Sequence, residues 1–273
     1  MSGVVVQKLG ASPDPSTYES PVVWRMRVWR DTLERSAHYP CEASHKMVHN
    51  PAYIKNLAFS NTHVSVTTED TLDAARRLQR MGLNPAVLNF ADNFIAGGNV
   101  ITGSGAQEES LWRRTNLCKT QLQTFYPLLG EGVGPVEGIY SPAVTVFKSP
   151  EAERYGDVAE PWRVGVISVP AIPYPSLQGG RMGVSDTEVF RKKIELVLQI
   201  ANRRGHDSVV LGAFGCGAWR GPPQQIAELF RDVLREWAGA FREVVFACLH
   251  TEGRGGGTYR SNYEVFRGVL HGQ

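Results

Sequence analysis

The sequence predicts an α/β fold in which one sheet is covered by helices on both faces. Two observations support this prediction. From residue 63 onward, segments with the composition of strands alternate with segments of helical periodicity, and such alternation places helices on both sides of a sheet. Two of the strands, residues 86–90 and 208–212, are short apolar runs, which is typical of strands buried on both faces.

The chain of 273 residues is long enough for one large domain or two small ones. Hydrophobic residues make up 42% and charged residues 21%, which excludes wholesale disorder. The net charge of +2 is too balanced to predict binding to nucleic acid or to a membrane surface. No apolar run approaches the ~20 residues that a membrane helix needs.

Four cysteines are scattered along the chain without a Cys-x-x-Cys pair, which argues against a disulfide framework and a cysteine zinc site. We therefore expect an intracellular protein, cytoplasmic or nuclear. Cys41, His45 and His49 recur at intervals of four and could share one face of a helix as metal ligands. Because Pro40 and Pro51 interrupt such a helix, we interpret this segment as irregular chain without a metal site.

Residues 1–20 are rich in Ser, Pro and Gly and are expected to form a loose N-terminal arm. They lack the basic head and apolar stretch of a secretory signal. Trp24, Val28, Trp29 and Leu33 recur near helical spacing, so residues 22–36 are predicted to form an amphipathic helix. We assign residues 21–273 to one domain that includes this N-terminal helical extension.

The remaining elements are predicted from residue composition and from the capping residues and glycines that begin and end them. Expected strands cover residues 63–67, 86–90, 144–147, 164–169, 208–212 and 243–249. Expected helices cover residues 69–81, 106–126 with a break, 185–204, 222–238 and 259–270. Thr68 and Ser185 are the expected N-caps, whereas Gly82 and Gly205 are expected to end their helices.

A glycine-rich loop, residues 96–105, follows the apolar strand 86–90 and precedes a helix. Glycines let backbone N–H groups turn toward an anion, and the positive end of the following helix adds to the attraction. The loop therefore predicts phosphate binding. It is not a dinucleotide or P-loop fingerprint, because Gly103 and Gly105 are followed by Gln and Glu, and no Gly-Lys-Ser/Thr occurs in the chain.

Two acids, Glu108 and Glu109, occupy the first turn of the helix predicted after this loop. One interpretation is compensation of the helix dipole, worth about 0.3–1 kcal/mol. The other is chemical, but adjacent helical residues point about 100° apart, so both acids reach one ligand only at an irregular helix start or if the ligand wraps around it. A glutamate that donates a proton must also be desolvated strongly enough to outweigh the dipole.

A second glycine-rich loop, residues 211–221, repeats the arrangement of buried strand, glycines and helix. Two such loops could grip a diphosphate from both sides. Trp219 offers a flat face for a sugar or a base, and Arg220 offers charge, although a tight turn with a packed indole explains the same residues. Cys216 has no histidine partner in the sequence pattern and is interpreted as a packing residue rather than a nucleophile.

These motifs carry a resemblance to a known family. Ala-Gly-Gly-Asn at residues 96–99, followed by Gln-Glu-Glu-Ser-Leu-Trp-Arg-Arg at 107–114, resembles the microbial type of poly(ADP-ribose) glycohydrolase, a branch of the macrodomain superfamily. That family carries Gly-Gly-Gly, a short spacer and Gln-Glu-Glu. The similarity extends to residues 68–78, 139–147, 211–217 and 241–249, and so covers most of residues 22–270.

The resemblance implies a macrodomain-like mixed sheet sandwiched between helices, and an enzyme that binds ADP-ribose and hydrolyses its glycosidic bond. Glu109 matches the catalytic acid, which protonates the departing atom at the ribose anomeric carbon. Glu108 matches the neighbour that positions the ribose hydroxyls. The other residues expected at the substrate are Asn89, Asp92, Gly97, Gly98, Asn99, Gln107, Gly215, Cys216, Gly217, Ala218 and Trp219. No cofactor and no metal is implied.

The sequence departs from the family pattern at Asn99, which stands where a third glycine is expected. Asparagine tolerates left-handed backbone better than most residues, so the turn is expected to survive. Asp92 adds an acid near the ribose site, and an acid can orient a guanidinium leaving group. Protein-linked mono-ADP-ribose, including arginine-linked conjugates, is therefore an alternative substrate to the polymer.

The expected partners are ADP-ribose and ADP-ribosylated proteins, with no direct contact to nucleic acid or membrane, and the oligomeric state is left open. A second hypothesis is a reader module that binds ADP-ribose without cleaving it. A third, an unrelated dinucleotide-binding oxidoreductase, is disfavoured because the Rossmann fingerprint is missing.

Overall fold

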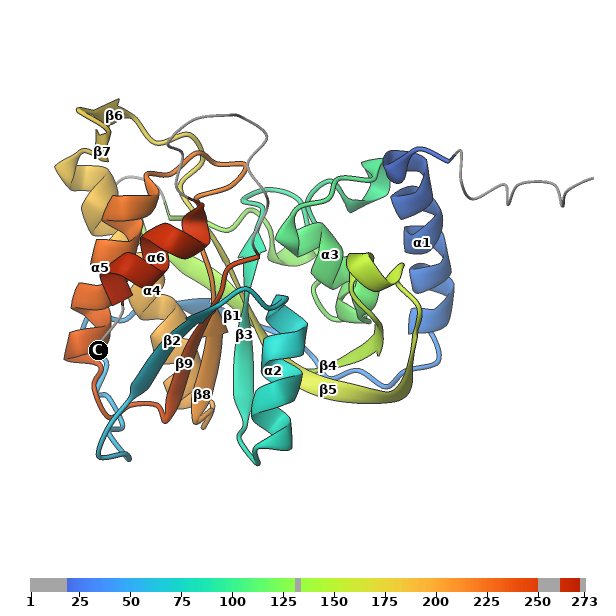
Figure 1. Ribbon diagram of the computed structural model, residues 1–273, viewed down its shortest axis with the longest axis horizontal. Helices are drawn as coiled ribbons and strands as arrows, with labels where there is room; N and C mark the ends of the chain where they lie inside the picture. The colour runs from blue at the N-terminus through green and yellow to red at the C-terminus, as the bar shows by residue number, and fades with distance from the viewer. Residues whose placement is uncertain (1–18, 131–133, 250–260, 271–273) are drawn as a thin grey trace, which may run out of the picture.

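The computed structural model describes residues 19–130, 134–249 and 261–270. A seven-stranded mixed sheet in the order β1-β4-β5-β3-β8-β9-β2 forms its centre (Figure 1). Strands β5, β3, β8, β9 and β2 run parallel to one another, and β4 is antiparallel to both β1 and β5. The strands are β1 (His45–Val48), β2 (His63–Thr67), β3 (Pro85–Ala91), β4 (Glu137–Lys148), β5 (Asp157–Pro170), β8 (Ser208–Leu211) and β9 (Glu243–Ala247).

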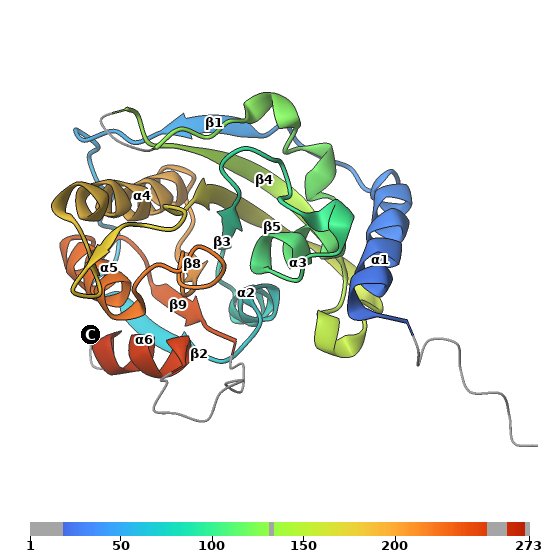
Figure 2. The same ribbon diagram turned by 90° about the horizontal axis from the view of Figure 1, so that it is seen from above.

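Helices cover both faces of this sheet (Figure 2). One face carries α1 (Pro21–Ser36), α2 (Thr71–Arg80) and α3 (Gln107–Arg114), and the other carries α4 (Val184–Arg203), α5 (Pro223–Glu236) and α6 (Asn262–Leu270). Each layer has its own apolar core, with Leu78 and Trp112 in the first and Phe190 and Phe230 in the second. The predicted α/β sandwich is therefore confirmed. None of the helices in the described ranges is long and apolar enough to cross a membrane.

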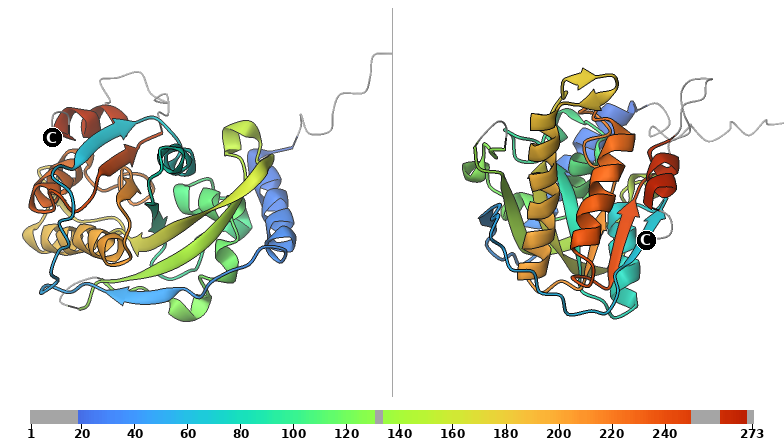
Figure 3. Two further views of the ribbon diagram at one scale, coloured as in Figure 1. Left: turned by 90° about the horizontal axis from the view of Figure 1, so that it is seen from below. Right: turned by 90° about the vertical axis from the view of Figure 1, so that its left-hand side faces the viewer.

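Helix α1 lies at the outer end of the long β4–β5 hairpin, beyond α3 (Figure 3). The Ser20 hydroxyl accepts a hydrogen bond from the Val23 amide and caps its start. Trp29 packs against Trp112 of α3 with ring centroids 5.9 Å apart. The helix predicted over residues 22–36 is thus confirmed, whereas the predicted loose arm, residues 1–20, lies almost wholly outside the described residues.

Several predicted helix ends are wrong, each for a local reason. The cap of α2 is Asp70, whose Oδ1 atom accepts a hydrogen bond from the Leu72 amide at 2.8 Å, rather than Thr68. Helix α4 begins directly after Gly183 without a side-chain cap, so Ser185 does not cap it. The helix predicted over residues 106–126 ends at Arg114, and only short 3-10 turns follow at Leu117–Lys119 and Gln123–Phe125. The start predicted for the last helix, residue 259, lies outside the described residues.

Two elements were not predicted. The segment interpreted as irregular chain contains β1, an edge strand that pairs with β4. A small hairpin, β6 (Leu177–Gln178) and β7 (Arg181–Met182), precedes α4. Within the described part of the chain, no three His, Cys, Asp or Glu residues are grouped so that they could hold a metal ion.

Candidate active site

The two glycine-rich loops lie next to each other because their strands are neighbours. Strand β3 pairs in parallel with β8, with Ala86 opposite Val209. Carboxyl ends of parallel strands meet at one edge of a sheet, where ligands of open α/β sheets bind. Phe90, next to the end of β3, and Phe214, after β8, have ring centroids 5.6 Å apart. The structure thus brings together the loops after residues 90 and 211, as the sequence predicts.

Glu108 is almost completely buried at the start of α3, with 3% of its surface exposed. Its Oε2 atom accepts a hydrogen bond from the Asp92 amide at 2.7 Å, and its Oε1 atom accepts one from Asn89 Nδ2 at 3.1 Å. Burial raises the pKa of Glu108 to about 8, against the opposing effect of these two donors. At neutral pH this carboxyl group therefore carries a proton.

Glu109, also buried, is held differently. Its Oε1 atom accepts a hydrogen bond from the Asn99 amide at 3.0 Å. Its Oε2 atom is buried and receives no hydrogen bond from the described residues. A buried oxygen without a partner is costly in a folded protein, and here it belongs to a carboxyl group beneath the first glycine-rich loop. Glu109 therefore has one oxygen that a backbone amide holds and one that no described residue hydrogen-bonds.

Gly97 and Gly98 let the first loop close over these acids. Both have left-handed backbone, with φ of +79° and +55°. A Cβ on Gly97 would lie 2.6 Å from the Trp112 ring, and a Cβ on Gly98 would lie 2.8 Å from Glu109 Oε1 and 3.0 Å from Glu108 Oε2. Only glycine fits at these two positions. Asn99 has φ of −98°, so the third position of the motif needs no left-handed residue, contrary to our expectation.

Gln107 ties the start of α3 to the sheet. Its Oε1 atom accepts a hydrogen bond from the Phe90 amide at 2.9 Å, and its Nε2 donates to the Leu88 carbonyl at 2.7 Å. Nε2 also lies 3.4 Å from Thr71 Oγ1 at the start of α2. The amide thus replaces a strand partner for β3. Although predicted at the substrate, Gln107 is engaged with the protein in this structure.

Asn89 and Asp92 also support the acids. Asn89 is fully buried, and its Nδ2 donates to Ser168 Oγ at 3.0 Å as well as to Glu108. Asp92 Oδ1 accepts hydrogen bonds from the amides of Phe94 and Ile95, at 2.7 and 2.9 Å, and so forms the turn that follows β3. Its Oδ2 atom has no hydrogen bond within the described ranges.

The second loop offers backbone amides and an aromatic face. Gly215 has φ of +76°, and the amides of the exposed Gly217 and Ala218 donate to no backbone carbonyl among the described residues. Trp219 is half-buried and packs edge-on against Tyr174, with centroids 5.7 Å apart. Cys216 is buried, and burial raises the pKa of its thiol. This agrees with its interpretation as a packing residue rather than a nucleophile.

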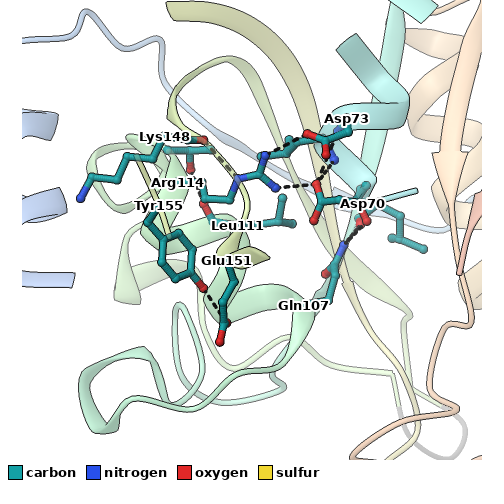
Figure 4. A network of polar contacts seen from close by, with 12 residues as sticks. Asp70, Asp73, Gln107, Leu111, Arg114, Lys148, Glu151 and Tyr155 are labelled. Carbon is teal, nitrogen blue, oxygen red and sulfur yellow. Dashed lines mark hydrogen bonds and ion pairs between the residues drawn. The ribbon is translucent and has the colours of Figure 1, made fainter. Parts of the chain in front are cut away.

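Arg114 anchors the other end of α3 (Figure 4). Its guanidinium pairs with Asp70, the cap of α2, and with Asp73 at 3.2 Å, while Nε donates to the Lys148 carbonyl at 3.2 Å. Thr115 then turns the chain into extended backbone and bridges to β4. Helix α3 is therefore held at both ends, by Gln107 and by Arg114, and the two acids have little freedom to move. Arg114 is part of the motif at residues 107–114, but its anchoring contacts with α2 and β4 depend on packing that the motif does not show.

A cavity of about 520 Å³ lies between α2 and the β4–β5 hairpin. Its lining includes Asp73, Arg76, Glu153 and Trp162, with charges of both signs. No residue predicted at the substrate lines it. The carboxyl groups of Glu108 and Glu109 therefore do not line this cavity.

Comparison with known proteins agrees with this geometry. Residues 29–149 match the family model described as the catalytic domain of microbial-type PARG. That segment is similar to the microbial-type PARG family. It contains both acids and the first glycine-rich loop. The resemblance found in the sequence is therefore confirmed. No curated protein matches the chain at a significant level.

Solved structures extend the likeness to most of the chain. The poly(ADP-ribose) glycohydrolase from Thermomonospora curvata is 28% identical and superimposes with a TM-score of 0.74, over 90% of this chain and 98% of that one. The same enzyme bound to the inhibitor ADP-HPD is 29% identical, with a TM-score of 0.73, over 89% and 97% of the two chains. The enzyme from Deinococcus radiodurans, in complex with ADP-ribose, is 28% identical with a TM-score of 0.64, over 90% of each chain. These matches confirm the macrodomain-like fold.

Proposed function

We propose that this protein is an ADP-ribosyl glycohydrolase that binds ADP-ribose and hydrolyses the bond at its ribose anomeric carbon. The observation that carries the proposal is Glu109, a buried carboxyl group with one oxygen held by the Asn99 amide and the other without a partner among the described residues. It lies beneath the first glycine-rich loop, which follows β3, and β3 pairs with β8, the strand that precedes the second loop. The family match and the ADP-ribose complex of the Deinococcus enzyme support the choice of ligand.

In the proposed reaction, Glu109 donates a proton to the leaving atom as the bond to the anomeric carbon breaks. The ribose passes through an oxocarbenium-like state. The Glu109 carboxylate then accepts a proton from water as the water oxygen bonds to the same carbon, and the acid is regenerated. Glu108, which is protonated at neutral pH, is proposed to hydrogen-bond a ribose hydroxyl. The amides of residues 217–219 are proposed to bind the diphosphate.

Poly(ADP-ribose) is the first substrate to test, because the similar solved structures are poly(ADP-ribose) glycohydrolases. Arginine-linked mono-ADP-ribose is the second, because Asp92 is half-buried and its Oδ2 atom has no hydrogen bond among the described residues. A carboxylate oxygen of this kind can pair with a guanidinium leaving group. Chromatography of released ADP-ribose from each defined conjugate distinguishes the two substrates.

The deciding variant is Glu109→Gln. We expect it to lose at least a hundredfold in ADP-ribose release, the size of effect typical for removal of a general acid, while calorimetry still detects ADP-ribose binding. Glu188→Gln, at an exposed position on α4, is the matched control and should retain full activity. Wild-type rates in Glu109→Gln would refute its role. Binding without turnover by the wild-type protein on every linkage would instead select the reader hypothesis.

A further inference from the structure

One turn after Glu109, on the same face of α3, lies Arg113. Its side chain is completely buried. Nε donates to Tyr155 Oη at 3.0 Å, and the guanidinium carbon lies 5.4 Å from the Tyr155 ring centroid. The two terminal nitrogens, Nη1 and Nη2, have no hydrogen-bond partner among the described residues. A guanidinium is always charged in proteins, so this position holds a buried cation whose terminal donors are unpaired.

The groups behind Arg113 form a chain that leads to α1. Tyr155 Oη donates to Glu151 Oε2 at 3.0 Å. Glu151 forms an ion pair with Arg25 of α1, with Arg25 Nη2 at 2.6 Å from its Oε1. The pKa of Arg25 is raised foremost by this hydrogen bond to Glu151, with a smaller contribution from Glu109. Arg25 also lies against the first glycine-rich loop, because a Cβ on Gly105 would come within 2.6 Å of its guanidinium carbon.

The backbone that supplies Tyr155 is strained. Arg154 and Tyr155 are consecutive non-glycine residues with φ of +60° and +54°, a conformation that side chains with a Cβ rarely adopt. Such strain persists only where the surrounding structure over-determines it, and it clusters at functional sites. Here it places the Tyr155 hydroxyl on Arg113 Nε and its ring 5.3 Å from Trp24 of α1.

The two unsatisfied groups lie one turn apart. Glu109 Oε2 and the two Arg113 Nη atoms are all buried and unpartnered, and residues four apart on a helix are neighbours. A cation near a buried acid stabilises the charge left when that acid gives up its proton.

Resting on the proposed function, we propose that Arg113 is a positioning residue that stabilises the Glu109 carboxylate formed when the leaving group takes its proton, and that Tyr155, Glu151 and Arg25 hold Arg113 in place for this purpose. By this proposal the N-terminal helix belongs to the catalytic unit. Six charged or titratable groups then belong to this unit: Glu108, Glu109, Arg113, Tyr155, Glu151 and Arg25.

The test compares Arg113→Met, which removes the charge, with Arg113→Lys, which keeps it. Arg113→Met should lower kcat at least tenfold, equivalent to about 1.4 kcal/mol of transition-state stabilisation, with KM and the calorimetric Kd for ADP-ribose nearly unchanged. The high-pH limb of its kcat profile should move to higher pH, because the acid loses the neighbouring cation. Arg113→Lys should restore part of the rate and of the profile.

Lys148→Met is the matched control, since Lys148 is another buried cation, paired with Asp31. It should lower the unfolding midpoint without moving the pH profile. Unfolding midpoints of all variants separate loss of folded protein from loss of rate. If Arg113 has a purely structural role, Arg113→Met should have a lower unfolding midpoint but an unchanged pH profile of kcat once the rate is corrected for the amount of folded protein. That result would overturn the proposal.

A second measurement keeps the inference separate from the proposed function. The carboxyl carbon of Glu109, identified by its absence in Glu109→Gln, can be followed by NMR during a pH titration of glutamate-labelled protein. Its midpoint should move to higher pH in Arg113→Met even if no conjugate is cleaved. An unchanged midpoint overturns the coupling. If the wild-type protein cleaves no conjugate but the titration midpoint of Glu109 shifts in Arg113→Met, only the proposed glycohydrolase activity is refuted.

Discussion

Glu108 makes the stability of the fold depend on pH. Burial raises its pKa from 4.5 to about 8, although the Asp92 amide and Asn89 Nδ2 both donate to it and favour its charged form. The perturbation we propose is Glu108→Gln, which keeps the size and one acceptor oxygen of the side chain and removes its titration. Its amide nitrogen faces one of the two donors, so the variant carries a cost of about 1–3 kcal/mol that does not change with pH.

The sign follows from the number of protons bound. Below pH 4.5 the folded and unfolded chains both carry the Glu108 proton, and the stability that it contributes is complete. Between pH 4.5 and about 8 the folded protein keeps the proton that the unfolded chain releases. The free energy of unfolding therefore falls by about 1.4 kcal/mol for each pH unit in this window, roughly 5 kcal/mol in all.

Urea unfolding of both proteins at pH 5 and pH 8 measures this dependence. Most other titrating groups are common to the two proteins, so their contributions largely cancel in the comparison. From pH 5 to pH 8, the wild-type protein should lose several kcal/mol more of its free energy of unfolding than Glu108→Gln does. Equal losses in the two proteins would show that Glu108 is ionised when folded, and the reasoning from burial would be wrong.

Two further predictions concern the loops. Gly98→Ala places a Cβ 2.8 Å from Glu109 Oε1 and should lower kcat for ADP-ribose release about a hundredfold, as small displacements of reacting groups do. Gly82→Ala is its matched control, because Gly82 also has a positive φ, +81°, but nothing lies within 4 Å of an added Cβ. This control should lose about 1–2 kcal/mol of stability and no activity. An equal loss of activity in both variants would contradict the argument. Trp219→Ala should raise the calorimetric Kd for ADP-ribose about tenfold, since aromatic stacking is worth about 1–3 kcal/mol; an unchanged Kd would remove Trp219 from the binding site.

Alternation of strand and helix patterns was enough to predict the sandwich, because buried strands such as residues 86–90 are read directly from their apolar runs. It did not reveal β1, since three of its four residues are exposed and an edge strand of that kind has no hydrophobic signature. It also extended α3 too far. The Asn116 side chain accepts from the Thr145 amide of β4 and draws the chain out of the helix, a long-range contact that local periodicity cannot show.

The sequence predicts which segments form the candidate site. It does not predict what each side chain in those segments contacts. A Cβ on Gly98 would lie 2.8 Å from Glu109 Oε1 and 3.0 Å from Glu108 Oε2, so the loop lies over both acids. The Gln107 side chain hydrogen-bonds the backbone of β3 at Leu88 and Phe90. This contact joins residues distant in the sequence, so local patterns do not predict it. Arg113 had a signal in the sequence, its spacing of four from Glu109, but its burial and its link to Tyr155 come only from the packing of α1 and the β4–β5 connection.

The pairing of β3 with β8 also determines how the candidate site can adapt to ligands of different sizes. Both loops are attached to one hydrogen-bonded ladder, in which neighbouring strands stay about 4.8 Å apart. The bases of the two loops therefore cannot move apart as two lobes joined by a hinge can. Accommodation of bulkier groups must therefore occur at the loop tips, where Phe94, Ile95 and Ala218 are exposed. Substitutions at these tips can change which conjugates are admitted while the carboxyl groups beneath remain undisturbed.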